Sequence, residues 1–359
     1  MMKKWNIGWG TISSCNMKCQ FCYSEHKRKQ SNDLSYEEWI KFIDENHGFI
    51  GSINYGTGEN TISDDWFRLV EYIHKKYPEI RQALTTNGYL SEAVKRGDNL
   101  KIFYEAIDEI DVSLDFADAE KHGELRGQPA AWKWAINTLK LCQDYNKPAT
   151  IVFLGSKKNL YKENIDGIFE VAKKYGAILR MNMYRPTRGL DEMSAEFIAS
   201  YDDITMALKY INEHYNILSL NDALFSTILT DQTICDPSGN KSIRILADGS
   251  ITPSTYLIED GYIVGNICDN NILLKLEQSK ALEKIIHKII PNECTECIYC
   301  DSCEGGVYDR RYLWFGTLEK KDPYCPGAYK KPNDNPLCCS KPEVISVHDG
   351  YLPTMFFKP

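Results

Sequence analysis

The chain has 359 residues, 43% of them hydrophobic, so it can form one large domain with a smaller one, or two of medium size. A formal net charge of −8 argues against a nucleic-acid surface, and the densest basic run, residues 27–29, is interpreted as a solvated helix face. The start of the chain shows neither a signal peptide nor a membrane span, so we expect a cytoplasmic protein. Thirteen cysteines in a reducing compartment indicate metal binding or catalysis rather than disulfides.

Short apolar runs alternate with longer stretches of helical periodicity up to about residue 215, which predicts repeated β/α units with a parallel sheet. The predicted strands are residues 5–11, 49–55, 80–86, 109–115, 149–154 and 177–183. The predicted helices are residues 36–46, 65–76, 99–106, 130–145, 161–175 and 193–215. In parallel β/α barrels the loops after the strands converge on one mouth, so functional residues should follow the strands.

Three cysteines follow the first predicted strand within eight residues: Cys15, Cys19 and Cys22, with Phe21 just before the third. Thiolates bind zinc and iron–sulfur clusters, and three of them leave one iron of a 4Fe-4S cube without a protein ligand. Zinc usually takes four ligands in pairs, and no further cysteine follows before Cys142. The triplet therefore favours a cluster, with zinc or reduced structural thiols as the alternatives.

The spacing of this triplet, three residues and then two, resembles the signature of the radical SAM enzymes, where SAM is S-adenosylmethionine. The six β/α units likewise resemble the partial (β/α)6 TIM-type barrel of that family. The resemblance implies that the open iron binds the amino and carboxylate groups of SAM. It further implies that an electron from the cluster splits the sulfonium to give a 5'-deoxyadenosyl radical, with an electron donor such as flavodoxin or ferredoxin as partner.

Polar residues after later strands would complete the SAM site by the same resemblance. Gly56-Thr57-Gly58-Glu59 resembles the Gly-Gly-Glu motif that receives the SAM amino group, with Thr57 in place of a glycine. The other implied contacts are Phe21, Asn87 for the ribose, Ser113 and Asp115 after the fourth strand, Arg126 for the SAM carboxylate, and the backbone around Met183 for the adenine. Structural alternatives remain open: a tight turn at Asn87, a helix cap at Asp115 and a surface ion pair at Arg126.

From residue 216 to residue 359 the β/α rhythm is lost and the chain is richer in Cys, Pro and Gly, which predicts a second domain with a small core held by metal. Its cysteines resemble the SPASM extension of radical SAM enzymes, which houses auxiliary 4Fe-4S clusters and is common among enzymes that modify ribosomally made peptides (RiPPs). The resemblance implies one auxiliary cluster on Cys294, Cys297, Cys303 and Cys325, with Cys300 left open. Ser254 and Val307 replace cysteines of the other cluster, so we expect it to be missing.

The lost cluster leaves Cys235 without its partners. In peptide epimerases of this superfamily an adenosyl radical removes a Cα hydrogen and a cysteine thiol returns one to the opposite face. We therefore predict a peptide epimerase acting on a precursor peptide, with Cys235 as hydrogen donor; a buried inert thiol is the alternative. Further donor candidates are Cys268, Cys300, Cys338 and Cys339.

Three other functions are weighed against epimerisation. The first is formation of a thioether or carbon–carbon crosslink in a peptide. The second is oxidation of a serine or cysteine in a protein partner, as sulfatase-maturing relatives do, and the third is a non-enzymatic iron–sulfur or zinc binding module. Near the end of the chain, residues 344–352 show two strand-like runs about a turn, which predicts that they add to a sheet or guard the entrance.

Overall fold

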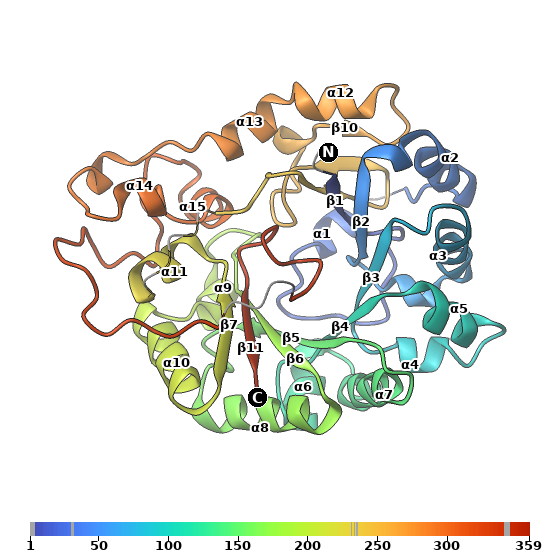
Figure 1. Ribbon diagram of the computed structural model, residues 1–359, viewed down its shortest axis with the longest axis horizontal. Helices are drawn as coiled ribbons and strands as arrows, with labels where there is room; N and C mark the ends of the chain where they lie inside the picture. Colours follow the sequence, from blue (N-terminus) through green and yellow to red (C-terminus); the bar gives the residue numbers. More distant parts are fainter. Residues whose placement is uncertain (1–3, 30–31, 231, 233, 235, 341–344) are drawn as a thin grey trace.

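The computed structural model describes residues 4–29, 32–230, 232, 234, 236–340 and 345–359. Its centre is a run of six parallel strands, each followed by helical segments, and Figure 1 shows the helices outside the strands. The strands are β1 (Trp5–Trp9), β2 (Ile50–Tyr55), β3 (Arg81–Thr86), β4 (Glu109–Ser113), β5 (Ala149–Gly155) and β6 (Ile178–Met183). The predicted α/β fold with a partial β/α barrel is confirmed.

The helices of these units agree closely with the predicted ranges, except for the last. They are α1 (Glu25–Arg28), α2 (Tyr36–Asn46), α3 (Asp64–Lys76), α4 (Leu90–Ala93), α5 (Asn99–Ala106), α6 (Ala119–Arg126), α7 (Ala131–Asp144), α8 (Lys162–Tyr175), α9 (Glu192–Phe197) and α10 (Tyr201–His214). The single helix predicted over 193–215 was wrong. The chain breaks because Ser200 and Asp203 form a capping box, each side chain accepting a hydrogen bond from the other residue's backbone amide.

The two faces of the barrel strands carry different side chains. The outer face is apolar and packs on the helices: Trp9 meets Phe42 of α2 edge to face at 5.5 Å, and Tyr55 meets Trp66 of α3 in the same way at 5.5 Å. Each fully buried side chain of this kind stabilises the fold by about 1.5–3 kcal/mol. The inner face is mostly small or polar, and Arg180 of β6 lines an internal pocket. The sheet therefore leaves a polar interior for a site.

The carboxyl-terminal part of the chain adds strands at both edges of the sheet. The full strand order is β10-β9-β8-β1-β2-β3-β4-β5-β6-β11-β7. The added strands are β7 (Asn216–Leu220), β8 (Ser242–Ile245), β9 (Ser250–Thr252), β10 (Gly265–Asn266) and β11 (Met355–Lys358). Of these, β8 pairs parallel to β1, and β11 lies antiparallel between β6 and β7. The domain boundary near residue 215 stays a prediction.

The remaining helical segments cover the carboxyl-terminal part. They are α11 (Ala223–Leu229), α12 (Ile272–Glu277), α13 (Lys280–Ile286), α14 (Cys300–Cys303) and α15 (Tyr308–Phe315), with short 3-10 turns η1 (His47–Phe49), η2 (Asn60–Ile62), η3 (Asp260–Tyr262) and η4 (Asn292–Cys294). In Figure 1, α12 and α13 lie beside β10 at the top of the view. In the part of the chain that the structure describes, no helix has the length and apolar character needed to cross a membrane.

The segment just before β11 closes the barrel from inside. The strand-like runs predicted over 344–352 were wrong for the described residues 345–352, which lie outside strands and mostly form turns; the strand that joins the sheet is β11. The Val347 amide donates to Glu109 Oε1 at 2.8 Å, and the Val347 carbonyl accepts from Asn6 Nδ2 at 2.5 Å. Because Asn6 and Glu109 lie at the beginnings of β1 and β4, this segment closes the amino ends of the strands.

Phe357 tests the insertion of β11. Its side chain is fully buried and lies 6.3 Å from the Phe169 ring of α8. We expect Phe357→Ala to lower the free energy of unfolding by about 3 kcal/mol or more, because it opens a cavity in the core. Urea denaturation followed by tryptophan fluorescence measures this loss. The neighbouring exposed residue gives the control: Lys358→Ala should change the value by less than about 0.5 kcal/mol. Equal losses would contradict the insertion.

Candidate functional site

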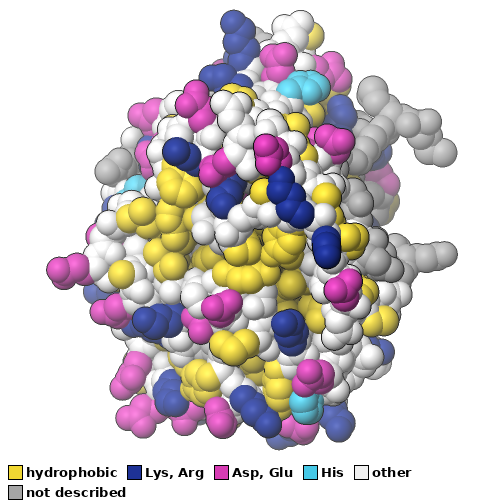
Figure 2. All heavy atoms as spheres, turned by 90° about the vertical axis from the view of Figure 1, so that its left-hand side faces the viewer, with side chains coloured by type: hydrophobic (Ala, Val, Ile, Leu, Met, Phe, Trp, Pro, Cys, Tyr) yellow, Lys and Arg dark blue, Asp and Glu magenta, His cyan; other side chains and the backbone are white. Residues whose placement is uncertain are grey.

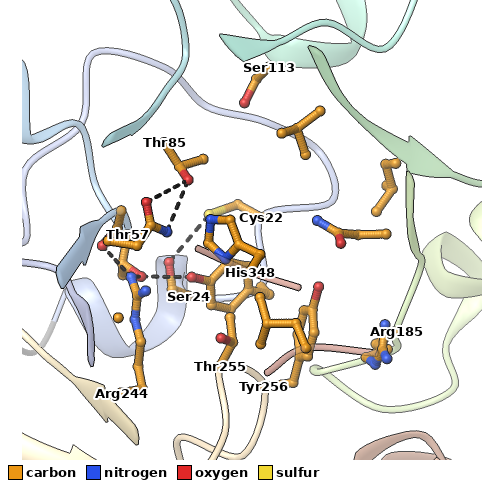
Figure 3. A pocket seen from close by; sticks show the side chains of 18 of the residues that line it. Cys22, Ser24, Thr57, Thr85, Ser113, Arg185, Arg244, Thr255, Tyr256 and His348 are labelled. Atoms are coloured by element: carbon orange, nitrogen blue, oxygen red, sulfur yellow. Dashed lines mark hydrogen bonds between the residues drawn. The ribbon is translucent and has the colours of Figure 1, made fainter. Parts of the chain in front are cut away.

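A pocket of about 250 Å³ lies at the carboxyl ends of the barrel strands and extends into the interior (Figure 3). It brings together most of the residues that the sequence indicates for SAM and its cluster. Those that line it are Cys15, Cys19, Phe21, Cys22, Thr57, Gly58, Asn87, Ser113, Asp115 and Arg126. Glu59 and Met183 do not line the pocket; both are buried behind it. The roles of these residues stay predictions.

The three amino-terminal thiols share this pocket but differ in their electrostatic surroundings. Burial raises the pKa of Cys15, and it raises that of Cys19 to about 12. Burial alone would also raise the pKa of Cys22, but the Arg28 guanidinium outweighs it and lowers the value; Arg28 Nη2 lies 3.5 Å from the sulfur. A cysteine thiol must lose its proton to bind iron as a thiolate, and Arg28 favours the thiolate form of Cys22.

Arg28 was misjudged from the sequence, where residues 27–29 were interpreted as a solvated face. It ends helix α1 and turns back toward the cysteine loop. Its Nη1 donates to the Ser13 carbonyl at 2.6 Å and its Nε donates to Ser24 Oγ at 3.2 Å. The guanidinium therefore fixes both ends of the loop that carries the triplet. A basic residue six positions after the third cysteine was the available signal.

The donor set fits an iron–sulfur cluster better than a single ion. No group of three or more His, Cys, Asp or Glu side chains, within the described ranges, surrounds one point closely enough to hold one metal ion. The charge of Cys22 nevertheless acts on the pKa of both Cys15 and Cys19, so the three thiols are near one another. Thiolates bound to separate irons of a cube lie farther apart than ligands of one zinc ion, so the triplet is compatible with a cluster.

The turn after β2 presses against the cysteine loop. Thr57 and Gly58 both have left-handed backbone, with φ of 77° and 72°. A Cβ on Gly58 would lie 2.6 Å from the Ile12 carbonyl oxygen and 2.7 Å from that of Ser14, so no other residue fits without a backbone shift. Thr57 accepts the same conformation with a branched side chain, and its hydroxyl lies 2.6 Å from that of Tyr23.

Glu59 is buried behind the pocket wall with its carboxylate already engaged. Its Oε1 accepts from the hydroxyls of Thr61 at 2.5 Å and Thr86 at 2.9 Å, while Oε2 accepts from the Asn87 amide at 2.7 Å. Burial still raises its pKa. In the ligand-free protein Glu59 thus fixes the turn after β2 to the end of β3. Contact with the SAM amino group stays a prediction for this residue.

Asn87 and the pair of Asp115 and Arg126 lie around the triplet. Asn87 Nδ2 approaches Cys15 Sγ at 3.9 Å. Arg126 donates from Nε to Asp115 Oδ2 at 2.7 Å, and its guanidinium lies 5.1 Å from the centre of the Phe21 ring. Arg126 is only 8% exposed, so the surface ion pair considered from the sequence was wrong; the pair is internal.

A polar cluster on the pocket floor escaped the sequence analysis. Asp111 Oδ2 lies 2.8 Å from Arg180 Nη2 and 2.7 Å from His348 Nε2, and it accepts from the Thr85 hydroxyl at 3.1 Å. Burial alone would raise the pKa of Asp111, but Arg180 and His348 outweigh it and lower the value. The alternation in β6, with Arg180 and Asn182 two apart, was a signal for inward side chains.

A second pocket gathers the carboxyl-terminal cysteines. Its lining includes Cys294, Cys297, Cys300, Cys303 and Cys325. Burial raises the pKa of Cys294 to about 11 and also raises that of Cys303. The rest of the lining is largely apolar, and Figure 2 shows hydrophobic side chains gathered across the middle of the face on the left of Figure 1, where α11 and α14 lie. All four predicted ligands of the auxiliary cluster are thus in one place, and Cys300 is beside them.

Two positions that would carry cysteine ligands of the other auxiliary cluster, 254 and 307, have other side chains in this protein. Val307 is completely buried, and the Ser254 hydroxyl lies 3.3 Å from Asp309 Oδ2. Asp309 in turn accepts from Arg185 Nε at 2.5 Å. Cys235, predicted as the hydrogen donor, lies outside the described residues.

Comparison with known proteins agrees with this geometry. Residues 10–170 match the model of the radical SAM superfamily. Mycofactocin maturase MftC of Mycobacterium ulcerans is 25% identical over 338 residues, covering 91% of this chain and 89% of the relative. AdoMet-dependent heme synthase of Methanosarcina barkeri is 29% identical over 349 residues, covering 89% of this chain and 95% of the relative. Native anSMEcpe with bound AdoMet and Cp18Cys peptide has the same fold, with a TM-score of 0.71 at 18% identity over 89% of this chain and 93% of that one.

Gly58 tests the contact between the turn and the cysteine loop. We expect Gly58→Ala to slow the reductive cleavage of SAM by about 100-fold, because the added methyl displaces the backbone that leads into Cys15. Chromatography of 5'-deoxyadenosine from the anaerobically reconstituted protein measures the rate. Gly48→Ala is the control, since a Cβ there has no atom within 4 Å. A normal rate in Gly58→Ala would rule out the tight contact.

Proposed function

Residues 10–170 form a radical SAM domain, and the protein is a radical SAM enzyme. From this premise we propose that it modifies a ribosomally made peptide. The favoured outcome is Cα epimerisation from L to D. The observation that carries the proposal is the convergence of three thiols with polar strand ends in one pocket, together with a second pocket that is lined by five cysteines. Because the protein is a radical SAM enzyme, we no longer consider the alternative of a non-enzymatic metal-binding module.

The residues of this chain would hold the cofactors and control the pocket. A 4Fe-4S cluster on Cys15, Cys19 and Cys22, with SAM, supplies a 5'-deoxyadenosyl radical that removes a hydrogen atom from a substrate. Arg28 favours the thiolate at Cys22, and Asn87 reaches toward Cys15. Glu59 fixes the Asn87 amide and thereby the end of β3. The cysteine loop and the polar strand ends are thus held in one arrangement before cofactors bind.

The epimerisation step needs a hydrogen donor from the protein. Cys235 would give the hydrogen atom of its S–H bond to the Cα radical of the peptide, forming the new Cα–H bond and leaving a sulfur radical. One electron from a flavodoxin or ferredoxin, with one proton, would restore the thiol. The thiol suits this step because its S–H bond is weak enough to quench a carbon radical.

A peptide substrate is supported by the relatives and by the pocket. One relative is a maturase, and the structure with the same fold has a peptide bound. The volume of about 250 Å³ is at the small end for ligand sites and must also take SAM. A peptide substrate needs to place only one residue in such a space. The heme synthase relative makes a tetrapyrrole substrate the second candidate.

Mass analysis of the product tests the function. The anaerobically reconstituted protein is incubated with SAM, dithionite and the short peptide encoded nearest its gene, in heavy water. Epimerisation predicts an unchanged covalent structure with one deuterium at a Cα and a D-residue on chiral analysis. A loss of two hydrogens would indicate the thioether or carbon–carbon crosslink instead. An unmodified peptide, with modification of an iron porphyrin under the same conditions, would refute the peptide function.

Iron content tests the auxiliary site. With both clusters the reconstituted protein should hold about eight irons per chain, and Cys303→Ala should reduce this to about four because one cube loses a ligand. Cys300→Ser is the matched variant, and full iron content there would leave the predicted set of Cys294, Cys297, Cys303 and Cys325 intact. If Cys300→Ser loses four irons and Cys303→Ala loses none, the ligand set is wrong.

A further inference from the structure

The main pocket is rich in positive charge although the chain as a whole is acidic, with a formal net charge of −8. Five arginines line it: Arg28, Arg126, Arg180, Arg185 and Arg244. Among the described lining residues the only carboxylate is that of Asp115. Such an excess of guanidinium groups in a largely enclosed space favours an anionic ligand.

Four of these arginines already have an acidic partner. Arg126 pairs with Asp115, Arg180 with Asp111, and Arg185 with Asp309, all at 2.5–2.8 Å. Arg28 lies against the Cys22 sulfur. Their charges are therefore offset by groups of this chain.

Arg244 of β8 is the exception. Its Nη2 donates to the Gly56 carbonyl oxygen and to the Thr57 hydroxyl, which are both neutral. No carboxylate of the described residues pairs with Arg244, and its buried Nε has no hydrogen-bond partner among them. The side chain is only 5% exposed, and burial lowers its pKa. An uncompensated buried charge costs several kcal/mol, and the free Nε–H of Arg244 favours an anionic ligand as its missing acceptor.

Arg244 lies at a different strand end from Arg126, the residue that the sequence assigns to the SAM carboxylate: Arg244 bonds to the turn after β2, whereas Arg126 pairs with Asp115 after β4. Figure 3 shows Arg244, Thr255 and Tyr256 on the side of the pocket opposite Thr85 and Ser113. The charged side chains that act most on the triplet are instead Arg28, Glu59 and Arg126. The Tyr256 ring packs on Tyr23 at 5.3 Å, which gives the anion an aromatic wall and strengthens its attraction to a guanidinium.

We propose that Arg244 binds a carboxylate of the substrate. The substrate is a peptide, as the function proposed above states. The carboxylate belongs to an acidic side chain or to the terminus of the peptide, at the modified end. Arg244 then determines which residue of the peptide enters the pocket. The two sources share one chemistry, a carboxylate that accepts an N–H bond from the guanidinium at its free Nε.

Peptide binding tests this assignment. Calorimetry measures binding of the short peptide encoded nearest the gene to the reconstituted protein in the presence of SAM. The peptide is used in its parent form, with single Asp→Asn or Glu→Gln replacements, and with a terminal amide. We expect one replacement to weaken binding to the wild type about 30-fold or more, and R244Q to bind both forms equally weakly. The replacement that acts identifies the source. K241Q, which removes a charge outside the pocket lining, should bind like the wild type.

Thermal stability gives a readout that needs no peptide. R244Q should raise the Tm of the ligand-free protein by about 2 °C or more, because it removes an uncompensated buried charge. R180Q should lower the Tm, because it leaves Asp111 without its cation. A lower Tm in R244Q, unaltered binding of every neutralised peptide, or loss of SAM binding in R244Q would overturn the assignment. A raised Tm in R244Q with no peptide binding by the wild type would support the anion site and contradict the peptide function.

Discussion

Four buried guanidinium groups of this protein, those of Arg126, Arg180, Arg185 and Arg310, are paired with carboxylates, and one of these pairs joins the barrel to the carboxyl-terminal part. Removing an ion from water costs several kcal/mol even after relaxation, so an unpaired partner would be strongly destabilising. Arg185 follows the last strand of the barrel, and its carboxylate, Asp309, lies in α15. Arg310 of the same helix lies between Asp222 and Asp322 at 2.6 Å from each. The Arg185–Asp309 pair thus joins the two parts of the chain, while Arg310 is paired within the carboxyl-terminal part.

The same interface contains Ser254 and Val307, the two positions where the sequence predicts that an auxiliary cluster is missing. A cluster would need thiolates at the positions of Ser254 and Val307. The structure instead has a hydroxyl bonded to Asp309 and a fully buried apolar side chain. The ionic contacts of Asp309 then hold the wall of the pocket near Tyr256, whose ring lies under the Arg185 guanidinium at 4.5 Å. The pocket wall at this place is therefore held by ion pairs.

Local sequence signals predicted the barrel well because its strands and helices are determined by short-range patterns. Helices 36–46 and 99–106 match to the residue, and the cysteine triplet and strand ends meet in one pocket as expected from parallel β/α geometry. The break at Ser200 was missed because the helical periodicity continues across it in the sequence, while the capping box of Ser200 and Asp203 starts a new helix in the structure. The inward segment at residues 345–352 and the contacts of Arg244 were missed because their partners are distant in sequence, and no local pattern records such contacts. Arg28 was missed although its partners, Ser13, Cys22 and Ser24, are close in sequence.

The position of β11 also bears on how the protein is made. Its neighbours in the sheet, β6 and β7, leave the ribosome well before it does, and the intervening segment takes on the order of ten seconds to synthesise. During that interval the two strands cannot adopt their final pairing, because each bonds to β11 rather than to the other. The nascent barrel therefore has an open seam until β11 has been synthesised, and iron–sulfur assembly in the pocket it encloses should follow the emergence of β11 from the ribosome.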